Sequence, residues 1–288
     1  MRNDLRNEAF EIEPSGGGVG AFVRGVDLSL GLSEIAATRM RAALGEHGVL
    51  FFRDQALSPE QHIEFAQRFG AINVNRFFAH VEGHPSIAQV LKEPHQTANI
   101  GGNWHTDHSY DQVPALGSVL LARETPPHGG DTLFSNMYAA YDGLSEGLKK
   151  TLQGLRAVHS SRHVFGRNAR YLQEGKDLAG RLGNSDEATQ DAVHPVVVRH
   201  PLSGRQALYV NRGFTVRFDG WTVEESKPLL DMLYAHGARP EYTYRFQWAP
   251  GSIAFWDNRI TWHYALNDYP GARRLMHRIT IEGEPLAA

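Results

Sequence analysis

Two short segments, far apart in the sequence, carry side chains that could bind a metal ion. The first, residues 104–107 (Trp-His-Thr-Asp), places an imidazole and a carboxylate two positions apart, so an extended backbone would direct His105 and Asp107 to the same side. The second segment ends at His263. A His-x-Asp pair arises about once by chance in a chain with 15 histidines, so the first segment alone proves nothing. Together, two histidines and one carboxylate can occupy one face of an Fe(II) ion and leave the opposite face open.

Two arginines after the second histidine could bind an anion beside that metal. Arg274 follows His263 by eleven residues, a reasonable length for a turn and a return onto a neighbouring strand, and Arg278 lies four residues further. An iron site of this type can chelate the keto-acid end of 2-oxoglutarate and leave a position for O2. The distal carboxylate then needs a fixed pair of donors, which arginine supplies and lysine does not. The two segments therefore favour 2-oxoglutarate-dependent oxygen chemistry.

The composition limits the other possibilities. The chain has 288 residues, a formal net charge of −3 and no cysteine. The missing cysteine excludes a disulfide framework, an iron–sulfur cluster, a thiolate zinc site and a cysteine nucleophile. No basic run supports a nucleic-acid partner. The sequence contains neither a stretch of about 18 apolar residues nor the apolar core of a signal peptide, so it does not indicate a membrane partner. We therefore expect a cytoplasmic protein.

Start and stop signals predict three helices. Ser33 opens an apolar-periodic run that ends at His47, before a glycine. Ser58 and Gln61 form a capping box, with proline at the first helical position, for a helix that reaches Gly70. A second capping box at Thr222 predicts a helix to residue 237, which Pro228 should kink.

Short β-branched and aromatic runs bounded by Gly, Pro and Asp predict strands between these helices. They lie at residues 49–52, 119–121, 196–198, 208–210, 242–246, 253–256 and 277–281, and the glycines at 16–18 predict a turn between two further strands. No linker divides the chain, and no glycine-rich phosphate loop follows a strand. We therefore expect residues 1–288 to form one mostly β domain, a sandwich or jelly roll with flanking helices, rather than a doubly wound sheet.

Seven motifs, in order and spacing, are similar to those of a known family. They lie at residues 104–107, 129–133, 194–197, 208–211, 213–215, 256–259 and 274–278. On these motifs, which span nearly the whole chain, the sequence resembles the taurine dioxygenase / 2,4-dichlorophenoxyacetate dioxygenase family of Fe(II)- and 2-oxoglutarate-dependent dioxygenases. The resemblance implies a double-stranded β-helix (jelly roll) and a homodimer or homotetramer.

The resemblance also implies roles for individual residues. By position, His105, Asp107 and His263 hold the iron, and Thr132 and Arg274 hold the far carboxylate of 2-oxoglutarate. By the same match, the substrate is a small organic anion whose charged end faces Arg278. Phe214 matches a phenylalanine of the family's substrate pocket. We also expect substrate contacts from Asn75, Phe78 and Phe165, and from His108 because it directly follows the metal-binding pair. The retained carboxylate of Asp107 favours hydroxylation over halogenation.

The loop before the metal pair departs from the taurine enzymes. Asn75 stands where they have histidine, Phe78 where they have tyrosine and Gly101 where they have asparagine. A pocket that has lost such polar partners has less reason to select taurine. The candidate substrates are therefore a sulfonate such as taurine or an alkanesulfonate, an alkyl sulfate, or an aryloxyalkanoate. Hydroxylation next to the leaving group would release an aldehyde or ketone with sulfite, sulfate or a phenol.

Two alternative functions of other classes remain open at this point. One is a non-catalytic jelly-roll protein that binds a metal or a small anion. The other is a zinc hydrolase that uses the same three ligands. Dependence on 2-oxoglutarate distinguishes the dioxygenase from both.

Overall fold

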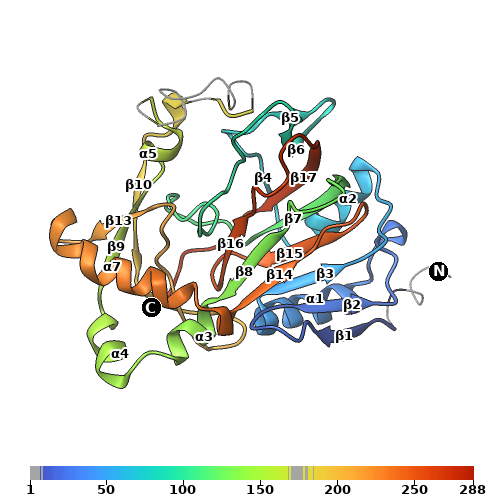
Figure 1. Ribbon diagram of the computed structural model, residues 1–288. Helices are drawn as coiled ribbons and strands as arrows, with labels where there is room; N and C mark the ends of the chain where they lie inside the picture. Colours follow the sequence, from blue (N-terminus) through green and yellow to red (C-terminus); the bar gives the residue numbers. More distant parts are fainter. Residues whose placement is uncertain (1–6, 8, 168, 170–177, 179–180, 184) are drawn as a thin grey trace.

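A nine-stranded sheet forms the largest layer of the computed structural model, which describes residues 7, 9–167, 169, 178, 181–183 and 185–288 (Figure 1). Its strands are β1 (Glu11–Pro14), β2 (Ala21–Arg24), β3 (Val49–Phe52), β4 (Ile72–Asn73), β5 (His80–Val81), β6 (His84–Lys92), β7 (Gly117–Glu124), β15 (Ile253–Asp257) and β17 (Arg274–Ile281). Their order is β1-β2-β3-β15-β7-β17-β6-β5, with β4 paired to β17. The expected turn at residues 16–18 joins β1 and β2, which pair antiparallel.

A smaller antiparallel sheet faces this layer. It contains β14 (Thr243–Phe246), β8 (Thr132–Asn136) and β16 (Thr261–Ala265), in that order. Aromatic rings fill the space between the sheets: the ring centroids of Phe51 and Phe246 are 4.3 Å apart, and those of Phe51 and Phe134 are 5.6 Å apart. Two antiparallel sheets packed over one core make the expected jelly roll.

The central strands of the large sheet are apolar on both faces, because the sheet is covered on both sides. In β3, Phe51 points into the core between the sheets, whereas Phe52 points into a second core beneath the helices. The same alternation places Trp256 and Phe255 of β15 in these two cores. This double burial explains why the run at 49–52 lacks polar alternation.

The three predicted helices are confirmed, and two of them cover the outer face of the large sheet. The three are α1 (Glu34–His47), α2 (Pro59–Gln67) and α7 (Val223–Gly237). Ser33 caps α1, which ends before Gly48 at a φ of 75°. Both capping boxes form as expected, at Ser58 for α2 and at Thr222 for α7. The helix α7 includes Pro228 within its bounds.

The remaining described elements are short. They are α3 (Met137–Asp142), α4 (Glu146–Leu152), α5 (Arg162–Phe165), β9 (Arg156–Ser160), β10 (Asp191–Pro195), β11 (Val197–Arg199), β12 (Gln206–Leu208), β13 (Thr215–Phe218), and the 3-10 helices η1 (Leu28–Leu30), η3 (Ser185–Glu187) and η4 (Pro240–Tyr242). Of the predicted strand at 196–198, Val197 and Val198 lie in β11, whereas Val196 is a bend after β10 and donates its N–H to the Leu155 carbonyl at 2.9 Å. Among the described residues, no helix has the length and apolar character needed to cross a membrane.

Candidate active site

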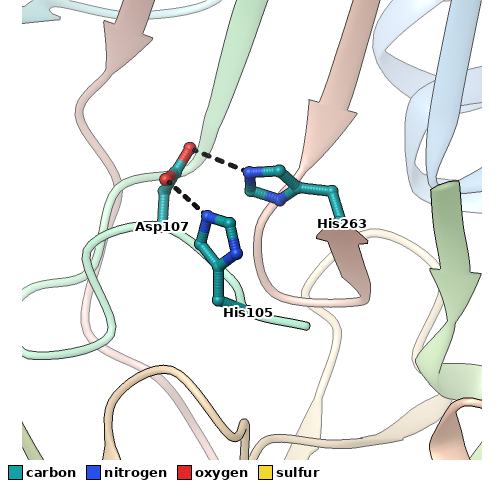
Figure 2. A group of neighbouring side chains, drawn as sticks. All are labelled: His105, Asp107 and His263. Carbon is teal, nitrogen blue, oxygen red and sulfur yellow. Dashed lines mark ion pairs between the residues drawn. The ribbon is translucent and has the colours of Figure 1, made fainter. Parts of the chain in front are cut away.

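Three side chains from the two metal-binding segments converge on one point. The ligand atoms that His105, Asp107 and His263 offer all lie within 4.8 Å of one another (Figure 2). The two Nε2 atoms of the histidines are 3.8 and 3.9 Å from different oxygens of the Asp107 carboxylate. All three side chains are buried. In the part of the chain that the structure describes, no other group of three such ligands comes together.

Backbone pairing brings the two histidines together. The N–H of His105 donates to the carbonyl of His263 at 3.1 Å, and the N–H of His263 donates to the carbonyl of His105 at 2.8 Å. His263 lies on β16, but residues 105–107 are not the extended segment that the sequence analysis expected. His105 forms only this isolated bridge, and a turn begins at Asp107. Gly213 lies against the bridge, where a Cβ would come within 2.7 Å of the His105 Cβ, so glycine is needed there.

The two imidazoles are prepared to donate lone pairs. The Nδ1 of His105 lies 2.8 Å from the Asn103 carbonyl, so this nitrogen carries the proton and Nε2 remains free to bind a metal. Burial lowers the pKa of His105, and burial together with the neighbouring His105 ring lowers the pKa of His263 further. Both rings are therefore neutral at physiological pH, the state that a metal ligand requires.

The carboxylate of Asp107 is held in its charged form. Burial would raise its pKa, but the charge of Arg278 outweighs burial and brings the pKa of Asp107 below its ordinary value. Arg278 Nη1 lies 3.3 and 3.4 Å from the two carboxylate oxygens, and Ser118 donates its hydroxyl at 3.0 Å. The site therefore presents a fixed negative oxygen between two neutral nitrogens.

Arg274 and Thr132 form a second set of donors. Arg274 Nε donates to the Gly130 carbonyl at 3.1 Å, while its buried Nη2 has no partner among the described residues. Thr132 Oγ1 accepts the indole N–H of Trp248 at 3.0 Å, so its own proton is free to be donated. Both residues line the same cavity as the triad. An unpartnered guanidinium N–H and a hydroxyl suit a carboxylate.

The ten residues between His263 and Arg274 do not lead to a neighbouring strand of the same sheet. His263 lies on β16 of the small sheet, whereas Arg274 begins β17 of the large sheet. The chain crosses from one sheet to the other, so the two side chains enter the space between the sheets from opposite sides. The sequence spacing did not distinguish this crossing from a hairpin, because both need a similar length of chain.

The triad and the arginines open onto one cavity of about 560 Å³. Phe78, Phe165 and Phe214 line it, as do Arg278 and Arg274. The Arg278 guanidinium lies 4.4 Å from the centroid of the Phe78 ring. Its buried Nε has no partner in the described part of the chain. The cavity thus combines a charged end with apolar walls.

Asn75 and His108 do not line this cavity, so the expected direct contact with substrate is not supported for either residue. The side-chain nitrogen of Asn75 and the Nε2 of His108 are 3.3 Å apart. The other ring nitrogen of His108 lies 2.8 Å from a carboxylate oxygen of Asp111. Both polar ends are occupied behind the cavity wall. His108 also has a φ of +57°, in the left-handed region that few non-glycine residues adopt.

Several residues of the site carry no signal in the sequence. Ser118 donates a hydrogen bond to Asp107, and Trp248 donates one to Thr132. Tyr110 forms part of the cavity wall. Each of their residue types is common in apolar segments. Tyr110 alone could have been suspected, because it follows the metal-binding pair by three residues.

The comparisons with known proteins agree with this geometry. Residues 11–280 match the family described as "Taurine catabolism dioxygenase TauD, TfdA family". The chain is 34% identical over 275 residues to an alpha-ketoglutarate-dependent sulfate ester dioxygenase from Pseudomonas putida, which covers 95% of this chain and 90% of that protein. It is 35% identical over 271 residues to an alkylsulfatase from Acinetobacter baylyi, with 93% and 83% covered.

A solved structure shows the same architecture. The crystal structure of AAD-2 in complex with Mn(II) and N-oxalylglycine superposes with a TM-score of 0.81 at 26% identity, covering 97% of this chain and 99% of that one. The resemblance inferred from the seven motifs is therefore confirmed. The chain belongs to the taurine dioxygenase / 2,4-dichlorophenoxyacetate dioxygenase family of Fe(II)- and 2-oxoglutarate-dependent dioxygenases.

Proposed function

We propose that this enzyme hydroxylates a small organic anion with an apolar body at a site where His105, Asp107 and His263 hold Fe(II). The observation that carries the proposal is the convergence of these three ligands on a cavity that also contains two arginines. The donor set fits Fe(II), because two neutral nitrogens and one carboxylate oxygen leave a face of the ion open. Fe(II), 2-oxoglutarate and O2 together supply the oxidation of a C–H bond, with release of succinate and CO2.

In this proposal, Arg274 and Thr132 bind the far carboxylate of 2-oxoglutarate. The buried Nη2 of Arg274 gains the partner that the described residues do not provide. Trp248 orients the Thr132 hydroxyl toward the same carboxylate by donating its indole N–H. The Gly130 carbonyl fixes the guanidinium plane from behind. These contacts set the position of the co-substrate before the reaction begins.

Arg278 has two tasks in the proposed site. Its Nη1 keeps Asp107 charged, while its other terminal nitrogen, Nη2, binds the anionic head of the substrate in the cavity that Arg278 lines. Phe78 and the other aromatic walls hold the apolar body and keep water away from the reacting C–H bond. Gly101 adds no side chain to this wall, which leaves room for a larger body than taurine has.

The apolar walls favour alkyl sulfates, alkanesulfonates with longer chains, and aryloxyalkanoates over taurine. Two of the relatives are named for sulfate esters, which supports the first of these classes. Hydroxylation at the carbon that bears the sulfate or ether oxygen gives an unstable product. It collapses to an aldehyde or ketone and releases sulfate, or a phenol in the case of an aryloxyalkanoate; a sulfonate releases sulfite.

The experiment is a matched panel of substrates. Purified enzyme with Fe(II), 2-oxoglutarate and O2 is given hexyl sulfate, hexanesulfonate, 2-phenoxypropionate or taurine, and succinate and the released anion or phenol are quantified. We expect one of the first three to yield equal amounts of succinate and released product, and taurine to yield far less. Succinate formation that no member of the panel stimulates would contradict the proposal.

We also propose that the working protein is a cytoplasmic homodimer or homotetramer in which residues 1–288 act as one domain. The family match, which extends from residue 11 to residue 280, supports the single domain. Sedimentation of the purified enzyme tests the oligomeric state, and a monomer at micromolar concentration would contradict it.

A further inference from the structure

One tyrosine in the cavity wall has a hydroxyl group without a hydrogen-bond partner among the described residues. Tyr110 is 2% exposed and lines the cavity beside the triad. The hydroxyls of two other buried tyrosines, Tyr138 and Tyr234, donate to the carbonyls of Gly45 and Thr215 at 2.9 and 3.3 Å. Within the described residues, no such bond satisfies the Tyr110 hydroxyl. The hydroxyl is not among the fully buried atoms without a partner, so it keeps contact with the cavity and its proton can be donated to a molecule that enters there.

Aromatic neighbours fix the position of this hydroxyl. The Tyr110 ring centroid lies 4.7 Å from that of Phe214, 5.4 Å from that of His108 and 6.0 Å from that of Phe165. His108 is itself fixed by its contacts with Asn75 and Asp111. A donor that is already held in place loses little conformational entropy when a ligand binds. Asn75 and His108, which lie behind the cavity wall, thus hold the Tyr110 ring in place.

Tyr110 and the charged residues Arg278 and Asp107 line the same cavity. Burial and the charges of Asp111 and Asp107 raise the pKa of Tyr110, whereas Arg76 and Arg278 lower it. The net shift is upward, so the phenol stays protonated and acts as a donor. Arg278 is the cation to which we assign the substrate's anionic head. Tyr110 therefore offers a neutral donor in the cavity that this cation also lines.

We infer that the Tyr110 hydroxyl binds the substrate by donating a hydrogen bond to an oxygen of the anionic head that Arg278 holds. This inference rests on the proposed function and adds a residue that determines specificity. A single guanidinium leaves the head free to rotate about its bond to the apolar body. A second donor, three residues after Asp107 and on the same turn, fixes that rotation and with it the C–H bond that faces the metal. Tyr110 does not take part in breaking the bond.

The test removes one oxygen atom from the protein. Tyr110→Phe keeps the ring and its aromatic contacts, and Tyr209→Phe is the matched control. Tyr209 is also 2% exposed and its hydroxyl also has no partner among the described residues, but it does not line the cavity. Wild type and both variants, each loaded anaerobically with Fe(II) and 2-oxoglutarate, are titrated with hexyl sulfate, hexanesulfonate and 2-phenoxypropionate. Perturbation of the visible charge-transfer band of the loaded enzyme reports the dissociation constant.

We expect Tyr110→Phe to bind the preferred anion about 10- to 100-fold more weakly, as the loss of a hydrogen bond to a charged group predicts. Its affinity for 2-oxoglutarate should be unchanged, which shows that the folded site is intact. Under turnover it should consume more 2-oxoglutarate per product, because the head is less firmly held. Tyr209→Phe should match the wild type in all three measurements.

Equal anion affinity in Tyr110→Phe and wild type would overturn the inference while leaving the proposed function standing. An equal loss in both variants would overturn it too, because the loss would then reflect general packing. Failure of the wild type to bind any of the anions would instead contradict the proposed function, and the inference would fall with it. The wild-type titration therefore separates the two failures.

Discussion

Replacing His62 by leucine should remove an acid-sensitive contribution to the stability of the fold. His62 lies on α2 and has no exposed surface. Burial and the charge of Arg123 lower its pKa from 6.5 to about 3. The unfolded chain therefore binds a proton at this residue as the pH falls through about 6.5, while the folded protein remains neutral until about pH 3. The contribution of neutral His62 to the free energy of unfolding is fully present above pH 6.5 and decreases as the pH falls from 6.5 towards 3.

The size of the effect follows from the shift. Each pH unit between the two pKa values changes the free energy of unfolding by about 1.4 kcal/mol, so at pH 5 the His62 contribution is about 2 kcal/mol smaller than at pH 7.5. Other groups titrate in the same range, among them His277, whose pKa burial and Arg123 lower to about 4. The difference between wild type and variant isolates His62 from them.

The assay is urea unfolding of the metal-free protein at pH 7.5, 6.0 and 5.0, since metal affinity would itself depend on pH. Wild type should lose about 2 kcal/mol relative to His62→Leu between the first and last pH. His95→Leu, at an exposed histidine, serves as the control and should follow the wild type. Parallel pH profiles for wild type and His62→Leu would refute the reasoning, because they would show that His62 takes up its proton equally in both states.

Three further predictions concern the site. Arg274→Lys keeps the charge but loses the planar pair of donors, so KM for 2-oxoglutarate should rise about 10- to 100-fold. The control is Arg273→Lys, at the half-exposed neighbour that pairs with Glu93, which should leave this KM unchanged. Equal KM values for both variants would contradict the assignment of Arg274 to the carboxylate. Trp248→Phe removes the donor that orients Thr132, and we expect a smaller rise of about 3- to 10-fold, measured in the same assay; no rise would mean that the hydroxyl is oriented by other means. Gly213→Ala puts a Cβ within 2.7 Å of the His105 Cβ. The variant should therefore bind Fe(II) more weakly in an equilibrium titration and lose about 1 to 3 kcal/mol of stability. An iron affinity of the variant equal to that of the wild type would contradict the close approach.

Local signals predicted the helices well because each signal lies within one turn of chain. The capping boxes at Ser58 and Thr222 depend only on a residue and its third neighbour, and both form. The strand at 49–52 was also recognisable, because burial on both faces leaves a continuous apolar run. In contrast, the run at 196–198 begins one residue too early, because Val196 still bonds to Leu155 next to β9, a partner distant in sequence, before β11 begins at Val197. Such a partner leaves no mark in the run itself.

The candidate site was predictable where it depended on residue type and not where it depended on topology. The three ligand candidates were recognised from their motifs, and the structure brings them together. The sequence analysis did not predict that β16 and β17 belong to different sheets, because a crossing and a hairpin need similar lengths of chain. It also assigned His108 to the substrate. That assignment rested on its place directly after the metal-binding pair, but the left-handed backbone of His108 turns the chain there and the residue does not line the cavity.

The most direct test of the account is an anaerobic titration of the metal-free protein with Fe(II), followed by 2-oxoglutarate. Wild type should bind one Fe(II) per chain, and addition of 2-oxoglutarate should then produce a visible charge-transfer band. Asp107→Ala should fail to give the same band at the same iron concentration, because one of the three ligands is lost. If wild type binds iron fully and 2-oxoglutarate produces no band, then His105, Asp107 and His263 do not form the centre of a 2-oxoglutarate-dependent dioxygenase.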